Sequence, residues 1–140
     1  MIENGWHTTQ IRVRYKDTDR MGVVYYGNYL TFFEVGRAEY MRAVGYPYSE
    51  LEVKGSALAV IEASAKYMAN VGYDEVIHVK TCIAEIGRVR LRFNYEIYSE
   101  TNTLLVTGFT VHACIKNDKK PVRIPDTLIS AVKKITNNQN

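Results

Sequence analysis

Two aspartates, Asp17 and Asp19, stand in a short polar segment ahead of a long stretch with helical periodicity. A carboxylate can attack a carbonyl carbon itself, or it can deprotonate a water molecule that does so. The first turn of a helix has unpaired backbone N–H groups and a partial positive charge, which suit a developing oxyanion. The segment is therefore compatible with carbonyl chemistry at Asp19. It is equally compatible with the loop and helix-cap roles that Asp-Thr-Asp sequences commonly have.

Gly22 and Gly27 flank the same segment, and glycine lets a ligand approach the backbone closely. The motifs of several other enzyme classes are missing from the sequence. The sequence has no GxSxG, which excludes the nucleophile elbow of α/β-hydrolases. It also has no GxGxxG and no GxxxxGK[ST], which excludes the common dinucleotide-binding and P-loop motifs. The three histidines, His7, His78 and His112, share no metal-ligand spacing, so we expect surface or sheet histidines and no metal site.

The elements that must position this segment follow from hydrophobic periodicity. Residues Gln10 to Tyr15 predict a short first strand, and Asp17 to Val24 a loop. A helix is expected from about Tyr26 to Val44, ended by Gly45 and Pro47. Its apolar stripe comprises Tyr29, Phe32, Phe33, Gly36, Tyr40, Ala43 and Val44. A glycine within such a stripe is compatible with close packing of the helix against a sheet.

Four long antiparallel strands are expected between Ala57 and Lys116. The clearest alternation runs from Arg88 to Ile97. Val89, Leu91, Phe93, Tyr95 and Ile97 face one way, whereas Arg88, Arg90, Arg92, Asn94 and Glu96 face the other. Pro125 can open a short helix with an apolar side of Leu128, Ala131, Val132 and Ile135. The last residues, Asn137 to Asn140, are expected to fray.

This order of elements indicates an α+β protein with a hotdog fold, in which one curved antiparallel sheet wraps around one long central helix. Residues 1–140 are expected to form a single domain. One such unit leaves sheet edges and a helix flank exposed, so we expect a homodimer or homotetramer.

Composition and charge narrow the function. The 140 residues are 46% hydrophobic and 24% charged, and they include 11 tyrosines. The hydrophobic and charged fractions are those of an ordinary globular protein. A net charge of +3 gives no argument for nucleic acid binding. No apolar run approaches the roughly 20 residues of a membrane helix, so no membrane span is expected. Cys82 and Cys114 lack CxxC spacing, so we interpret them as small apolar side chains in a reducing compartment. We therefore expect a cytoplasmic protein.

A longer pattern covers residues 17–30 and 33–42. It has the form T-D-x-x-G-x-V, then a tyrosine, then F-E-x-x-R-x-E-x-[LM]-R. This pattern resembles the signature of the YbgC/4-hydroxybenzoyl-CoA thioesterase family. The resemblance continues through Tyr67 and the segment from Tyr73 to Glu75, and it reaches Ile124 and Pro125. It therefore extends over nearly the whole chain.

The resemblance implies hydrolysis of an acyl-coenzyme A thioester without a cofactor, since coenzyme A is part of the substrate. Asp19 matches the family's catalytic carboxylate, and the backbone N–H of Tyr26 matches its donor at the helix N-terminus. Asp17 does not match the catalytic position and is expected to be structural or to act as a charge near Asp19. Many YbgC-type members have histidine where this chain has Tyr26, so no imidazole role is carried over.

The expected substrate contacts are Gly22 and Asn28 near the carboxylate and Arg88 and Arg90 for the coenzyme A phosphates. The competing interpretation of the arginines is a solvated sheet face. A further cluster, Glu34, Arg37 and Glu39, is expected to form an ion pair that orders the dimer.

Two other functions compete with hydrolysis. A hotdog dehydratase would act on hydroxyacyl thioesters, but such enzymes usually need a histidine with the carboxylate, and none lies near Asp19 in the sequence. A non-catalytic module could bind acyl-CoA or an acyl carrier protein. The sequence leaves open the acyl group, and whether Asp19 is a nucleophile or a general base.

Overall fold

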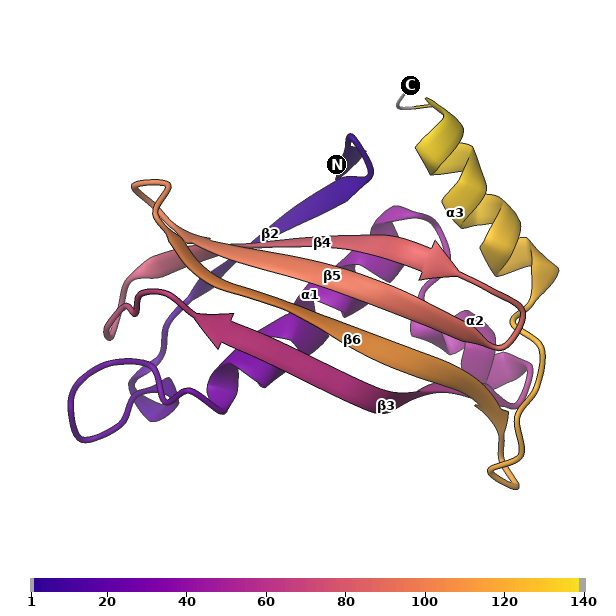
Figure 1. Ribbon diagram of the computed structural model, residues 1–140, viewed down its shortest axis with the longest axis horizontal. Helices are drawn as coiled ribbons and strands as arrows, with labels where there is room; N and C mark the ends of the chain where they lie inside the picture. Colours follow the sequence, from indigo (N-terminus) through magenta and orange to yellow (C-terminus); the bar gives the residue numbers. More distant parts are fainter. Residues whose placement is uncertain (1, 139–140) are drawn as a thin grey trace.

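A six-stranded antiparallel sheet dominates the computed structural model, which describes residues 2–138 (Figure 1). The strands are β1 (Ile2–Glu3), β2 (Trp6–Arg12), β3 (Ser56–Tyr67), β4 (Val76–Ile86), β5 (Arg90–Ser99) and β6 (Leu104–Lys116). Their order across the sheet is β1-β2-β4-β5-β6-β3, so the long strand β3 is an edge strand. The helices are η1 (Tyr15–Asp17), α1 (Asn28–Ala43), α2 (Tyr48–Val53) and α3 (Asp126–Asn138). The expected hotdog fold is confirmed.

Helix α1 packs against the sheet through the predicted stripe, and the reason for Gly36 is visible. A Cβ at this position would lie 2.5 Å from Oγ1 of Thr81 and 2.8 Å from Cγ1 of Val79, both on β4. The expected close approach of helix and sheet is therefore confirmed. The stripe was wrong at Ala43, which is exposed. Met41 is buried instead, because it follows the buried Phe33 by about two helical turns.

Other element boundaries differ from the prediction. The strand predicted from Gln10 to Tyr15 is β2, which begins earlier, at Trp6, and ends at Arg12, because the chain then turns into η1; the short β1 before it was not predicted. Strand β5 begins at Arg90, so Arg88 lies in the β4–β5 turn and not on the strand. The short helix α2 was not predicted, since Leu51 is its only buried residue and so short a segment shows no periodicity. Helix α3 extends to Asn138, and the rest of the expected tail, residues 139–140, lies outside the described residues.

The core contains one buried polar chain on the inner face of the sheet. The hydroxyl groups of Tyr95 and Thr110 are 2.6 Å apart, and Nε2 of His112 lies 2.8 Å from Oγ1 of Thr110. Burial, together with the nearby guanidinium of Arg37, lowers the pKa of His112 to about 4. Of Glu34, Arg37 and Glu39, which are expected to form an ion pair that orders the dimer, Glu39 pairs with Arg42 in this chain. The role of the cluster in a dimer stays a prediction.

We predict that this buried histidine makes the fold sensitive to mild acid. The pKa of His112 is lowered to about 4 in the folded protein, against about 6.5 unfolded, so the unfolded chain binds more protons between these values. Stability should therefore be full above pH 6.5 and fall by up to about 3 kcal/mol as the pH drops to 4. Urea unfolding of the parent and of His112→Gln across this range tests it. An equally steep loss in the variant would contradict the assignment.

Candidate active site

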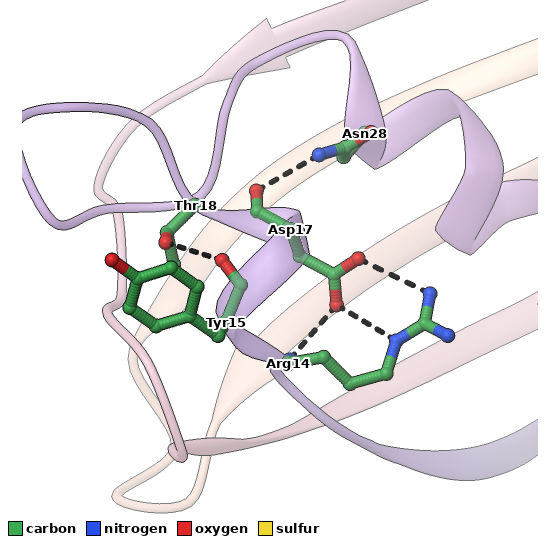
Figure 2. Close-up of polar contacts among 5 residues, drawn as sticks. All are labelled: Arg14, Tyr15, Asp17, Thr18 and Asn28. Carbon is green, nitrogen blue, oxygen red and sulfur yellow. Dashed lines mark hydrogen bonds and ion pairs between the residues drawn. The ribbon is translucent and has the colours of Figure 1, made fainter.

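The segment that carries the expected carboxylate, here called the Asp19 loop (residues 18–27), is held at both ends by hydrogen bonds. The backbone N–H of Val24 donates to the carbonyl of Val71 at 3.0 Å. At the other end, the carbonyl of Asp17 accepts from the N–H of Tyr25 at 2.9 Å and from Nδ2 of Asn28 at 2.8 Å (Figure 2). These bonds tie η1 to the start of α1 and give the Asp19 loop a defined conformation.

Asp17 is structural. The residue is 5% exposed, and its carboxylate accepts from the backbone N–H of Arg14 at 2.9 Å (Figure 2). The same carboxylate is 3.2 Å from Nη2 and 3.4 Å from Nε of the Arg14 guanidinium. Both carboxylate oxygens of Asp17 are therefore engaged, and its backbone carbonyl holds the Asp19 loop. Asp17 thus stabilises the loop that carries Asp19. The role of Arg14 was not predicted, although its three-residue spacing from Asp17 is a signal for such a pair.

Replacing Asp17 should mainly affect stability. Asp17→Asn removes the negative charge opposite Arg14, whose side chain is 60% exposed, so we expect a loss of about 1–2 kcal/mol. Because the backbone of the Asp19 loop stays in place, kcat should fall by less than about tenfold. Thermal unfolding and acyl-CoA hydrolysis of the purified variant check both parts. A thousandfold loss of kcat in a folded Asp17→Asn protein would show that Asp17, too, has a chemical role.

Asp19 is exposed and occupies a tight turn within the loop. Its N–H donates to the carbonyl of Val23 at 2.9 Å, and its carbonyl accepts from the N–H of Gly22 at 3.0 Å. One carboxylate oxygen accepts from the N–H of Met21 at 2.8 Å. Gly22 has a φ of +80°. Residues with a Cβ rarely adopt this value, so the turn requires glycine. The Asp19 carboxylate is thus fixed on a rigid turn and faces outward.

An open pocket of about 490 Å³ lies beside this carboxylate. The residues that line it are Tyr15, Thr18, Asp19, Arg20, Gly22 and Tyr73. Of the expected site residues, Asp19 and Gly22 therefore meet at one cavity.

The beginning of α1 offers free backbone donors. Among the described residues, neither the N–H of Tyr26 nor that of Gly27, the N-cap residue, has a hydrogen-bond acceptor. The carbonyl of Tyr26 is held by the hydroxyl of Tyr67 at 3.3 Å and by the N–H of Tyr29 at 3.2 Å. A Cβ on Gly27 would lie 2.8 Å from the Tyr25 ring, so glycine keeps this corner compact. These N–H groups can receive an oxyanion.

Two asparagines support the loop, a role that was predicted for neither. Asn28 was expected to touch substrate, but its side-chain nitrogen is engaged with the loop, as described above. Asn70 was not foreseen. Its Nδ2 donates to the carbonyl of Val24 at 3.1 Å, and its Oδ1 accepts from the Tyr29 hydroxyl and the Val71 N–H. No sequence pattern identifies Asn70, since Val24 and Tyr29 come from a remote part of the chain.

The two arginines expected to hold phosphate lie far from Asp19 within one chain. Arg90 begins β5, and Arg88 lies in the turn before it, whereas the Asp19 loop contacts Val71 and Gly72 ahead of β4. Because β4 and β5 are antiparallel, the start of β4 lies beside Ser99 at the far end of β5. The strand between these ends is about 30 Å long. Figure 1 shows the loop and the β4–β5 turn at opposite ends of the sheet.

Two kinds of feature, a metal site and a membrane-spanning helix, are absent from the described part of the chain. In residues 2–138, no group of three or more His, Cys, Asp or Glu side chains could hold a metal ion. No helix within these residues is long and apolar enough to cross a membrane.

A curved antiparallel sheet around a central helix is the hotdog fold, which solved thioesterases share. Residues 13–132 match the model of the thioesterase-like superfamily, and the chain belongs to this family. The acyl-CoA thioesterase YbgC of Haemophilus influenzae is 34% identical over 134 residues, which cover 94% of this chain and 96% of that protein. The chain is accordingly a thioester hydrolase of the kind that the YbgC-like signature predicted.

Solved structures agree with this assignment. A DHNA-CoA thioesterase from Staphylococcus aureus superposes with a TM-score of 0.87 at 36% identity, covering 96% of this chain and 95% of that one. Slr0204 from Synechocystis, a 1,4-dihydroxy-2-naphthoyl-CoA thioesterase, has a TM-score of 0.85 at 25% identity, covering 94% of this chain and 98% of that one.

Proposed function

We propose that this protein hydrolyses acyl-coenzyme A to the free acid and coenzyme A, with Asp19 as the catalytic carboxylate and the Tyr26 N–H as the oxyanion donor. The observation that carries the proposal is the combination on one rigid loop of an exposed carboxylate and a free N–H at a helix N-terminus. The relatives named above for acyl-CoA hydrolysis support the substrate class. The two cysteines, Cys82 and Cys114, are free thiols, which fits a cytoplasmic site of action.

The chemistry needs only groups that this chain supplies. A thioester carbonyl has weak resonance stabilisation, so one carboxylate and one or two amide donors can suffice without a cofactor. Asp19 either attacks the carbonyl to form a mixed anhydride, expelling the coenzyme A thiolate, or removes a proton from an attacking water molecule. Single-turnover hydrolysis in labelled water separates the routes. Label within Asp19 supports the anhydride, because water then cleaves the bond at the aspartyl carbon.

We further propose that the working unit is a homodimer built on β3. This edge strand spans 12 residues and has no proline. It leaves Val60 49% and Ile61 48% exposed, and an uncovered edge of this kind is a template for pairing. Two copies of β3 can pair antiparallel around a twofold axis, as isologous interfaces require. Such pairing sets the Ser56 end of one strand beside the Tyr67 end of the other.

This dimer would reunite the expected site residues. The hydroxyl of Tyr67 donates to the carbonyl of Tyr26, so the Tyr67 end of β3 lies beside the Asp19 loop. The Ser56 end pairs with the end of β6, and the chain that follows β6 donates from the Ile124 N–H to the carbonyl of Arg88 at 2.6 Å. Pairing of two β3 strands therefore brings Arg88 of one copy toward Asp19 of the other. Arg88 and Arg90 could then hold the coenzyme A phosphates, as expected.

Subunit complementation tests this arrangement. A mixed dimer of one Asp19→Asn chain and one chain carrying Arg88→Ala and Arg90→Ala has one fully intact site if each site uses both chains. It should recover about half of the parental kcat with the parental KM. If Asp19 and the arginines act within one chain, both sites stay defective and no native-like KM returns. Light scattering of each preparation confirms that the chains are dimeric.

An acyl-CoA panel tests the activity itself. Release of free thiol from short, long and aromatic acyl-CoA substrates supports hydrolysis. Loss of a hydroxyacyl substrate with no thiol release would instead favour the dehydratase. If the parent binds acyl-CoA or an acyl carrier protein but releases no thiol from any substrate, the binding-module interpretation replaces this proposal.

A further inference from the structure

One side chain outside the Asp19 loop, that of Asn70, holds the backbone between the carboxylate and the proposed oxyanion donor. Asn70 lies between β3 and β4, and its Nδ2 donates to the carbonyl of Val24 at 3.1 Å. The N–H of Val24 donates to the carbonyl of Val71 at 3.0 Å. Among residues 2–138, no backbone N–H donates to the Val24 carbonyl. Two consecutive residues of a remote segment therefore hold both polar backbone groups of Val24, and Asn70 holds the carbonyl.

Val24 lies between Asp19 and Tyr26 along the loop. The turn that carries the carboxylate closes at Val23, whose carbonyl accepts from the Asp19 N–H at 2.9 Å. The N–H of Tyr25 is also hydrogen-bonded, so the peptide unit between Val24 and Tyr25 is held at both its carbonyl and its N–H. The free N–H of Tyr26 belongs to the next peptide unit. A rotation at the Val24 carbonyl would therefore reorient the oxyanion donor relative to the carboxylate.

The Asn70 side chain also reaches the first turn of α1. Its Oδ1 accepts from the hydroxyl of Tyr29 and, at 2.9 Å, from the N–H of Val71. Tyr29 is 1% exposed, and burial raises the pKa of its phenol to about 12, so the hydroxyl remains a donor at neutral pH. The N–H of Tyr29 in turn donates to the carbonyl of Tyr26 at 3.2 Å. One amide group thus connects the Asp19 loop, the β3–β4 connection and the start of α1.

We propose that Asn70 is a positioning residue for hydrolysis, which fixes the Tyr26 N–H relative to the Asp19 carboxylate. The inference rests on the proposed function, because it takes these groups as the oxyanion donor and the catalytic carboxylate. Donors that are already in place stabilise an oxyanion without reorganisation, and a displacement of about 1 Å can cost about a hundredfold in rate. Asn70 is exposed, so a shorter side chain leaves no cavity in the core. Its loss should therefore affect the rate more than the stability.

Three variants separate the contacts of Asn70. Asn70→Ala removes all three hydrogen bonds and should lower kcat for acyl-CoA hydrolysis about 10- to 100-fold. Asn70→Asp keeps the acceptor for Tyr29 and Val71, but an ionised carboxylate cannot donate to the Val24 carbonyl, so kcat should fall as in Asn70→Ala. Tyr29→Phe removes only the contact with α1 and should lower kcat by less, about three- to tenfold. KM should change less than about twofold in all three, because none of the lost contacts is with the substrate.

Asn94→Ala is the matched control. Oδ1 of Asn94 accepts from Nε of Arg92 at 3.0 Å on the outer face of β5, so this variant also removes a side-chain hydrogen bond of an asparagine. It should keep the parental kcat. Backbone ¹⁵N relaxation gives a second measurement that needs no turnover. The order parameters S² of the Asp19 and Tyr26 amides should be about 0.85 in the parent and in Asn94→Ala, and should fall below about 0.7 in Asn70→Ala.

Other outcomes overturn the inference. Parental kcat in folded Asn70→Ala, or a loss that appears in KM alone, would exclude a positioning role. If Asn70→Ala does not fold, parental kcat in Asn70→Asp would exclude it equally. Unchanged order parameters in Asn70→Ala would show that other contacts hold the loop. The proposed function can fail separately: if the parent hydrolyses no thioester but the order parameters fall as expected, the assignment of hydrolysis is wrong, and Asn70 still fixes the Tyr26 N–H relative to Asp19.

Discussion

Asp19→Asn should reduce kcat for acyl-CoA hydrolysis by about a thousandfold or more while substrate binding persists. The amide can neither attack the thioester carbonyl nor accept a proton from water, and such roles contribute factors of this size. The fold should tolerate the change. Asp19 is exposed, and the amide oxygen can still accept the hydrogen bond from the Met21 N–H. Steady-state kinetics and calorimetric acyl-CoA binding to the variant measure both parts.

The chain offers a closely matched control for this variant. Asp118 is also exposed, and its Oδ1 accepts from the N–H two residues later, that of Lys120, at 3.0 Å. It therefore has the same kind of carboxylate-to-backbone hydrogen bond as Asp19, but it lines a different pocket and lies away from the start of α1. Asp118→Asn should keep the parental kcat. If Asp19→Asn hydrolyses acyl-CoA as fast as the parent, the assignment of the catalytic carboxylate is wrong.

Gly108→Ala should cost about 3 kcal/mol or more of unfolding free energy. A Cβ at this position would overlap the carbonyl oxygen of Ser64 and lie 2.6 Å from the Phe33 ring. The carbonyl belongs to the paired strand β3, and Phe33 is stacked on Tyr95 with centroids 4.2 Å apart, so neither neighbour can move freely. Overpacking of this kind costs roughly 1–3 kcal/mol in general, and contact with backbone places this site at the upper end.

Urea unfolding measures the effect, and Gly87→Ala is the control. At Gly87 the nearest atom to a new Cβ would be the carbonyl oxygen of Arg90 at 3.4 Å, an ordinary contact. That substitution should be neutral or stabilise by up to about 1 kcal/mol through the unfolded chain. Equal stabilities for Gly108→Ala and the parent would mean that α1 sits farther from the sheet than the structure has it.

Much of the architecture is legible in the sequence because it depends on local periodicity. Alternation over β4 and β5 and the helical stripe around Gly36 predicted which faces are buried, since burial selects apolar residues at fixed spacing. Boundaries were less accurate where tertiary contacts override the pattern. Arg88 continues the alternation of β5 but lies in a turn, and Ala43 fits the stripe but is exposed at the end of α1.

The candidate site shows the same contrast between what local sequence predicts and what tertiary contacts decide. The residues alone left Asp19 open between carbonyl chemistry and a loop or helix-cap role, and the resemblance to the YbgC/4-hydroxybenzoyl-CoA thioesterase family selected thioester hydrolysis. That Asp17 binds Arg14 and holds the loop through its carbonyl, and that Asn70 holds the loop at Val24, became visible in the folded chain. The fold also separates Asp19 from the β4–β5 turn by the length of a strand. The physical reason is that hydrogen bonds and distances between remote segments depend on how strands pair, which no local pattern encodes.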